Sequence, residues 1–110
     1  MTMTHDYADV EPARADIDAL KGPVVIEFGA PWCGYCCAAQ PLIAEAVADY
    51  PRVRHIKVED ARGRPLGRSF RVTLWPTLVF LIRGKEVARL VRPADSTAIS
   101  AALARIHVVD

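Results

Sequence analysis

Two cysteines separated by two residues, Cys33 and Cys36, are the residues of this chain best suited to chemistry. They follow the apolar run 24–28, which places them on a turn between a strand and a helix. One helical turn would bring the two sulfur atoms close enough to bond. The N-terminus of a helix carries about +0.5 elementary charge, which favours a thiolate over a thiol. This arrangement predicts reversible thiol–disulfide chemistry, in which a dithiol attacks another disulfide and then closes on itself.

A small metal-binding protein is the alternative that the same spacing leaves open. Cys37 directly follows the pair, so Cys33, Cys36 and Cys37 could all serve as ligands. Zinc usually takes four ligands. None of the three histidines stands at motif spacing from these cysteines, and the chain holds no second Cys-x-x-Cys. Redox chemistry is therefore the favoured interpretation, and no metal site is expected.

Length and charge restrict the class of protein. The 110 residues are expected to form a single domain, and 52% of them are apolar, which is enough for one core. A net charge of +1 gives no reason to expect nucleic acid or an acidic membrane surface as a partner. No apolar stretch approaches the roughly 20 residues that span a bilayer. The first residues lack the pattern of a secretory signal, so we expect a cytoplasmic protein. A monomer is the default expectation.

Strands and helices are expected to alternate along the chain. Hydrophobic patterning predicts strands at 24–28, 53–59, 78–82 and 86–91, and helices at 12–20, 33–50, 64–70 and from Ser96 as N-cap onwards. Pro12 fits a first helical position. Residues 1–10 are expected to be flexible or to hold a short edge strand around Tyr7. The alternation implies an α/β domain with a mostly parallel sheet, whereas the short turn at 83–85 makes the last two strands an antiparallel hairpin.

Several motifs stand at a shared spacing. The sequence Ala30-Pro31-Trp32-Cys33-Gly34-Tyr35-Cys36 precedes Pro41, and Trp75-Pro76-Thr77 precedes the third strand. With Gly84 in the hairpin turn, the chain from Val24 to its last helix resembles the thioredoxin family. The resemblance implies the thioredoxin fold, in which helices cover both faces of a mixed, mostly parallel sheet with a C-terminal antiparallel hairpin. It also implies protein disulfides as substrates, a thioredoxin reductase as electron donor, and no cofactor beyond the Cys33–Cys36 disulfide.

The resemblance assigns roles to four residues. Cys33, the more exposed thiol, would be the nucleophile, and Cys36, one turn deeper, would resolve the mixed disulfide. Glu27 stands where thioredoxins usually have a buried aspartate, so it would accept or relay the proton of Cys36. Lys57 would tune Glu27 by its charge. The alternatives are a Glu27 carboxylate that reaches the surface or pairs with Lys57, and a solvated Lys57.

Other residues would bind substrate. Pro76 matches the cis-proline of the family, which places backbone groups of Trp75 beside Cys33, where an extended substrate can pair with them. Trp32 and Trp75 would flank the site with flat apolar surface. Trp75 is bulkier than the residue usual there, so it is expected to narrow the groove.

Further departures from the family pattern concern the surface of the site. Tyr35, after Gly34, replaces a proline and adds an aromatic side chain for binding. Cys37 replaces a commonly charged residue and is expected to be small, partly buried and without a role; the alternatives are reaction with a partner, a link between two chains, or capture of an oxidant. The segment Val91-Arg92-Pro93 occupies the region where the family tends to have a glycine close to the site, so this surface is expected to be bulkier and positively charged.

The leading functional hypothesis is a thiol–disulfide oxidoreductase that reduces protein disulfides through Cys33 and Cys36. The alternative from another class is a non-catalytic binding or chaperone module of thioredoxin fold, in which the dithiol is incidental. The intact cysteine pair, Glu27 and Pro76 argue against that alternative.

Overall fold

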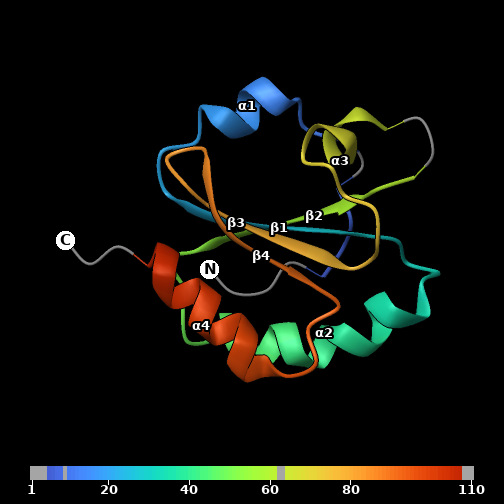
Figure 1. Ribbon diagram of the computed structural model, residues 1–110, viewed down its shortest axis with the longest axis vertical. Coiled ribbons are helices and arrows are strands. Elements are labelled where there is room, and N and C mark those ends of the chain that lie inside the picture. Colours follow the sequence, from blue (N-terminus) through green and yellow to red (C-terminus); the bar gives the residue numbers. More distant parts are fainter. Residues whose placement is uncertain (1–4, 9, 62–63, 108–110) are drawn as a thin grey trace.

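The computed structural model describes residues 5–8, 10–61 and 64–107. A four-stranded sheet of order β2-β1-β3-β4 lies between two pairs of helices. In chain order the elements are α1 (Arg14–Asp18), β1 (Pro23–Gly29), α2 (Gly34–Val47), β2 (Arg54–Glu59), α3 (Pro65–Ser69), β3 (Thr77–Ile82), β4 (Lys85–Val91) and α4 (Ser96–Ile106). Helices α1 and α3 cover one face of the sheet, and α2 and α4 cover the other (Figure 1).

The sheet is mixed, but two of its three strand pairs are antiparallel, so the expectation of a mostly parallel sheet is wrong. Only β1 and β2 run parallel. β2 ends at Glu59 opposite Gly29, and β3 begins at Thr77 opposite Phe28. The connection through α3 therefore leaves β2 and enters β3 at the same end of the sheet, the end at which β1 finishes. A strand that enters where the previous one left must run in the opposite direction. The β3–β4 hairpin is antiparallel, as predicted.

Two helix starts also differ from the prediction. α1 starts after Pro12, which therefore stands outside the helix. The N-cap of α4 is Asp95 rather than Ser96, because the Asp95 carboxylate accepts the backbone N–H of Ala98 at 2.9 Å. A carboxylate at this place also interacts favourably with the positive end of the helix dipole.

The segment around Tyr7 is not a strand in the part of the chain that the structure describes. A hydrogen bond from the backbone N–H of Ala8 to the carbonyl of Lys57, at 3.0 Å, links it to the sheet. The rest of the expectation for residues 1–10, at 1–4 and 9, lies outside the described residues.

Both faces of β1 are buried, which explains its nearly continuous apolar sequence. Ile26 and Phe28 pack with the core under α1 and α3, whereas Val25 packs with Phe80 under α2 and α4. Because side chains alternate along a strand, Glu27 shares the face of Val25. The one carboxylate of β1 is thus directed toward the helix that carries the cysteines.

Candidate active site

Cys33 is the N-cap residue of α2, at the point where the chain leaves β1 and starts the helix. Its backbone is extended (φ −86°, ψ 121°), and its Sγ atom accepts the backbone N–H of Cys36 at 3.2 Å. The helix dipole and this N–H group both stabilise negative charge on the sulfur. Cys33 is 9% exposed and Cys36 is 1% exposed, so Cys33 is the more accessible of the two thiols.

Cys36 lies one turn deeper, and all three cysteines are free thiols. Burial, followed by the hydrogen bond with Cys33, raises the pKa of the Cys36 thiol to about 12. This thiol is therefore protonated at neutral pH and needs a proton acceptor before it can attack. A Cβ atom at Gly29 would lie 2.6 Å from Cys36 Sγ and 3.1 Å from Tyr7 Oη. Glycine at the end of β1 thus leaves room for the deeper sulfur.

Glu27 is fully buried behind the cysteines, with two partners at its carboxylate. Nε2 of Gln40 donates to Oε2 at 2.8 Å, and Nε2 of His55 lies 2.9 Å from Oε1. Gln40 Nε2 also donates to the carbonyl of Cys36 at 2.9 Å. One amide group therefore joins the buried carboxylate to the backbone of the deeper cysteine.

Lys57 is the register partner of Glu27, but among the described residues no hydrogen bond or ion pair joins their side chains directly, which corrects the alternative of a Glu27–Lys57 pair; Gln40 bridges the two. The Nζ of Lys57 donates to Gln40 Oε1 at 3.0 Å and to the carbonyl of His5 at 2.9 Å, and lies 4.4 Å from the ring centre of Tyr7. Lys57 is 4% exposed, so it is not the solvated lysine of the other alternative. Lys57 thus links the N-terminal segment that contains His5 and Tyr7 to α2.

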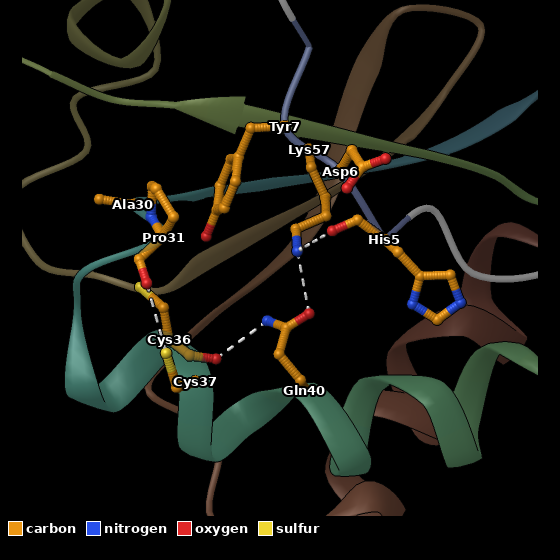
Figure 2. Close-up of a pocket in the computed structure, with 9 residues that line it drawn as sticks. All are labelled: His5, Asp6, Tyr7, Ala30, Pro31, Cys36, Cys37, Gln40 and Lys57. Carbon is orange, nitrogen blue, oxygen red and sulfur yellow. Dashed lines mark hydrogen bonds between the residues drawn. The ribbon is translucent and has the colours of Figure 1, made fainter.

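A pocket of about 720 Å³ opens between this segment and α2. Figure 2 shows the Tyr7 hydroxyl on the side of Pro31 and Cys36, and Lys57 extending toward Gln40. Burial raises the pKa of Tyr7, and the negative charge of Glu27 adds to this effect. The phenol is therefore neutral over the physiological range.

His55, Gln40 and Tyr7 were missed as site residues by sequence reasoning. A signal existed for His55, because it is two residues from Lys57 in β2 and Lys57 is opposite Glu27 in the register. A signal also existed for Gln40, which follows Cys36 by four residues on the same helix face. For Tyr7 the sequence contains no such signal, since no periodic pattern of apolar residues surrounds it.

The face of the site around Cys33 is aromatic. The Trp32 and Trp75 rings meet edge to face with centres 5.3 Å apart, and Trp75 packs against the cluster that contains Cys33. Trp32 is 70% exposed and Tyr35 is 60% exposed. The Trp75–Pro76 peptide bond is cis, the conformation that the resemblance implies.

Two hydrogen bonds fix Trp75, one at its indole N–H and one at its backbone carbonyl. Its Nε1 donates to Asp60 Oδ2 at 2.9 Å, and its carbonyl accepts Nε of Arg92 at 2.8 Å. The Arg92 guanidinium stacks 3.8 Å from the centre of the Tyr35 ring. The region of Arg92 is thus bulky and cationic.

Gly34 and Cys37 complete the predicted residues. A Cβ atom at Gly34 would meet nothing within 4 Å, so no packing contact requires glycine there. Cys37 is exposed rather than partly buried, because its position on α2 turns it away from the core, and its Sγ lies 3.5 Å from the carbonyl of Pro31.

Within residues 5–8, 10–61 and 64–107, no group of three or more His, Cys, Asp or Glu side chains is placed to hold a metal ion. In those ranges no helix has the length and apolar character needed to cross a membrane.

Comparison with known proteins gives consistent matches. The family model described as Thioredoxin matches residues 9–105. The structure of thioredoxin 2 from Pseudomonas aeruginosa in its reduced form is 54% identical, covers 94% of this chain and 96% of its own, and superposes with a TM-score of 0.85. The putative thioredoxin-4 of Dictyostelium discoideum is 32% identical over 80 residues, which are 72% of this chain and 77% of that protein.

A plant relative matches over a smaller share of its length. Thioredoxin H-type 1 of Nicotiana tabacum is 37% identical over 71 residues, 64% of this chain and 56% of the tobacco protein. The chain thus spans little more than half of that relative. Together with the structural match, these similarities confirm the fold expected from the sequence.

Proposed function

The chain belongs to the thioredoxin family of disulfide oxidoreductases, and from this premise we propose that it reduces disulfide bonds in other proteins with Cys33 and Cys36. The observation that supports this most is the unequal placement of the two thiols. Cys33 is the more accessible sulfur and caps α2, whereas Cys36 is buried and protonated behind it. Such a pair suits a nucleophile and a resolving thiol.

The proposed reaction has two displacements. The Cys33 thiolate attacks one sulfur of the substrate disulfide, whose S–S bond breaks, and the other substrate sulfur leaves as a thiolate. Cys36 then loses its proton and attacks the Cys33 sulfur in the mixed disulfide. The second substrate sulfur leaves and is protonated. Two electrons have passed to the substrate, and the protein holds a Cys33–Cys36 disulfide.

Glu27 is the proposed acceptor of the Cys36 proton. Its carboxylate lies in the same buried network as the Cys36 backbone, through Gln40. Lys57 acts on this network through Gln40 and thereby tunes Glu27 indirectly. The redox centre needs no cofactor other than the cysteine pair itself.

Substrate binding is proposed on the aromatic face. An extended segment would pair with backbone groups of Trp75, beside the cis-bonded Pro76, while Trp32, Gly34 and Tyr35 contact its side chains. A thioredoxin reductase is the proposed electron donor. A dithiol that must be kept reduced fits the cytoplasm, where thiols are maintained in that state.

Reduction of insulin disulfides in the presence of dithiothreitol tests this function. Acceleration over dithiothreitol alone is expected, whereas a non-catalytic binding module would give none. Equilibration with glutathione then gives the reduction potential of the Cys33–Cys36 pair, which shows whether the protein reduces or oxidises its substrates. A reduction potential near about −270 mV, the value known for thioredoxin itself, supports a reductant, and one near about −120 mV contradicts it.

A further inference from the structure

Arg92 occupies an unusual backbone position next to Trp75 and the cis-bonded Pro76. Its φ of +51° lies in the left-handed region that favours glycine, yet this residue carries a long cationic side chain. Its backbone N–H donates to the carbonyl of Pro76 at 2.9 Å, and its Nε donates to the carbonyl of Trp75 at 2.8 Å. Because Trp75 packs against the cluster that contains Cys33, these two bonds link Arg92 to a residue that borders the proposed nucleophile.

The guanidinium of Arg92 is fixed but not neutralised. Stacking 3.8 Å from the centre of the Tyr35 ring and the bond to Trp75 hold its plane. Of its five N–H donors, only Nε has a hydrogen-bond partner in the described part of the chain. Among those residues no carboxylate comes within ion-pair distance of it. The terminal nitrogens therefore remain for a carboxylate, whose two oxygens match the planar guanidinium.

A hollow of about 320 Å³ adjoins this cation, between α2 and the segment that precedes α4. Its lining is apolar at Ala38, Leu42 and Pro93, and Tyr35 and Arg92 also border it. Such a hollow accommodates an apolar side chain, and the exposed guanidinium accommodates an acidic one. The surface is thus complementary to a segment that carries an acidic residue close to an apolar one.

We propose that Arg92 makes this protein select substrates whose reactive disulfide is flanked by acidic residues. The inference rests on the proposed reductase function and adds the substrate class. A carboxylate of the substrate pairs with Arg92 while the neighbouring backbone docks at Trp75, and the disulfide then lies at Cys33. The charge accelerates productive encounter more than it strengthens the final complex.

The test uses three peptides with the same intramolecular disulfide, flanked by glutamate, glutamine or lysine. Stopped-flow measurement gives the second-order rate constant for oxidation of the reduced protein by each peptide. We expect the glutamate peptide to react about fivefold faster than the glutamine peptide at low salt, and the difference to shrink at high salt. In Arg92→Gly this ratio should fall to about one, and Arg92→Lys should retain part of it. Glycine suits the left-handed backbone, so Arg92→Gly keeps the fold.

Arg83→Gln is the matched control. Arg83 is also exposed with a positive φ, 52°, but lies in the β3–β4 turn, at the opposite end of β3 from Trp75. It should keep the wild-type ratio. Equal rates for all three peptides, or an acidic preference that persists in Arg92→Gly, would overturn this inference and leave the reductase function standing. Oxidation by none of the peptides would overturn both.

Discussion

The Sγ atom of Cys33 accepts the backbone N–H of Cys36 at 3.2 Å, so the first turn of α2 joins the two cysteines while both are free thiols. The nucleophile is therefore also a helix cap. Serine is a good cap, because its hydroxyl oxygen accepts the same N–H. Cys33→Ser should keep the thermal unfolding temperature of the reduced protein and abolish insulin reduction. Activity retained in this variant would reject Cys33 as the nucleophile.

Stability at high pH reports the state of Cys36. Burial raises the pKa of its thiol from 9.0 to about 12, so above pH 9 the folded protein keeps a proton that the unfolded chain loses. The stabilisation is complete below pH 9 and is lost as the pH rises through 12, by at most about 1.4 kcal/mol per pH unit. The difference in free energy of unfolding between the reduced wild type and reduced Cys36→Ala should shrink over this range. A difference that stays constant would contradict the protonated, buried thiol.

Glu27 is expected to affect the second displacement. Glu27→Gln keeps the size of the side chain and its hydrogen bond with Gln40, but it removes the proton acceptor. Release of product from the mixed disulfide should slow about a hundredfold to ten-thousandfold, as expected for loss of a general base. Glu45→Gln, at an exposed position of α2, is the control and should release product at the wild-type rate. Equal rates in the two variants would exclude Glu27 as the acceptor.

Space behind the deeper thiol is limited at Gly29. In Gly29→Ala the new methyl group would meet Cys36 Sγ, a buried atom with little freedom to move. Overpacking of this kind destabilises proteins by about 1–3 kcal/mol, which urea unfolding of the reduced protein can measure. At Gly22 a Cβ atom meets nothing within 4 Å, so Gly22→Ala should change stability far less. If both variants lost a similar free energy of unfolding, the close contact between residue 29 and Cys36 would not limit stability, and the account of Gly29 would be wrong.

The parts of the fold that depend on local pattern could be predicted from the sequence. The apolar runs located the strands, and the cysteine motif located the start of α2. The direction of β3 could not be predicted, because the alternation of strands and helices does not reveal at which end of the strands a connection re-enters the sheet. The β2–β3 connection, from Glu59 to Thr77, returns to the sheet at the same end of the strands from which it departs.

The candidate site was predictable to the extent that its residues belong to a motif. Cys33, Cys36 and Pro76 do, and in the structure Cys33 and Cys36 lie in one cluster, against which Trp75, the residue before the cis-bonded Pro76, packs. The partners of Glu27 are different, because the contacts that join His55 and Gln40 to it depend on strand register and helix placement. Strand register and helix placement are tertiary properties, so the spacing of His55 and Gln40 along the sequence places them near the site but does not fix these contacts.

The most direct test of the central claim is to identify the sulfur that attacks first. Reduced Cys36→Ser is mixed with a disulfide peptide, and the trapped adduct is mapped by proteolysis and mass spectrometry. Because Cys37 is an exposed free thiol, it is an internal competitor of Cys33. We predict that the peptide is attached to Cys33. Attachment at Cys37, or no adduct, would contradict a nucleophile placed at the start of α2.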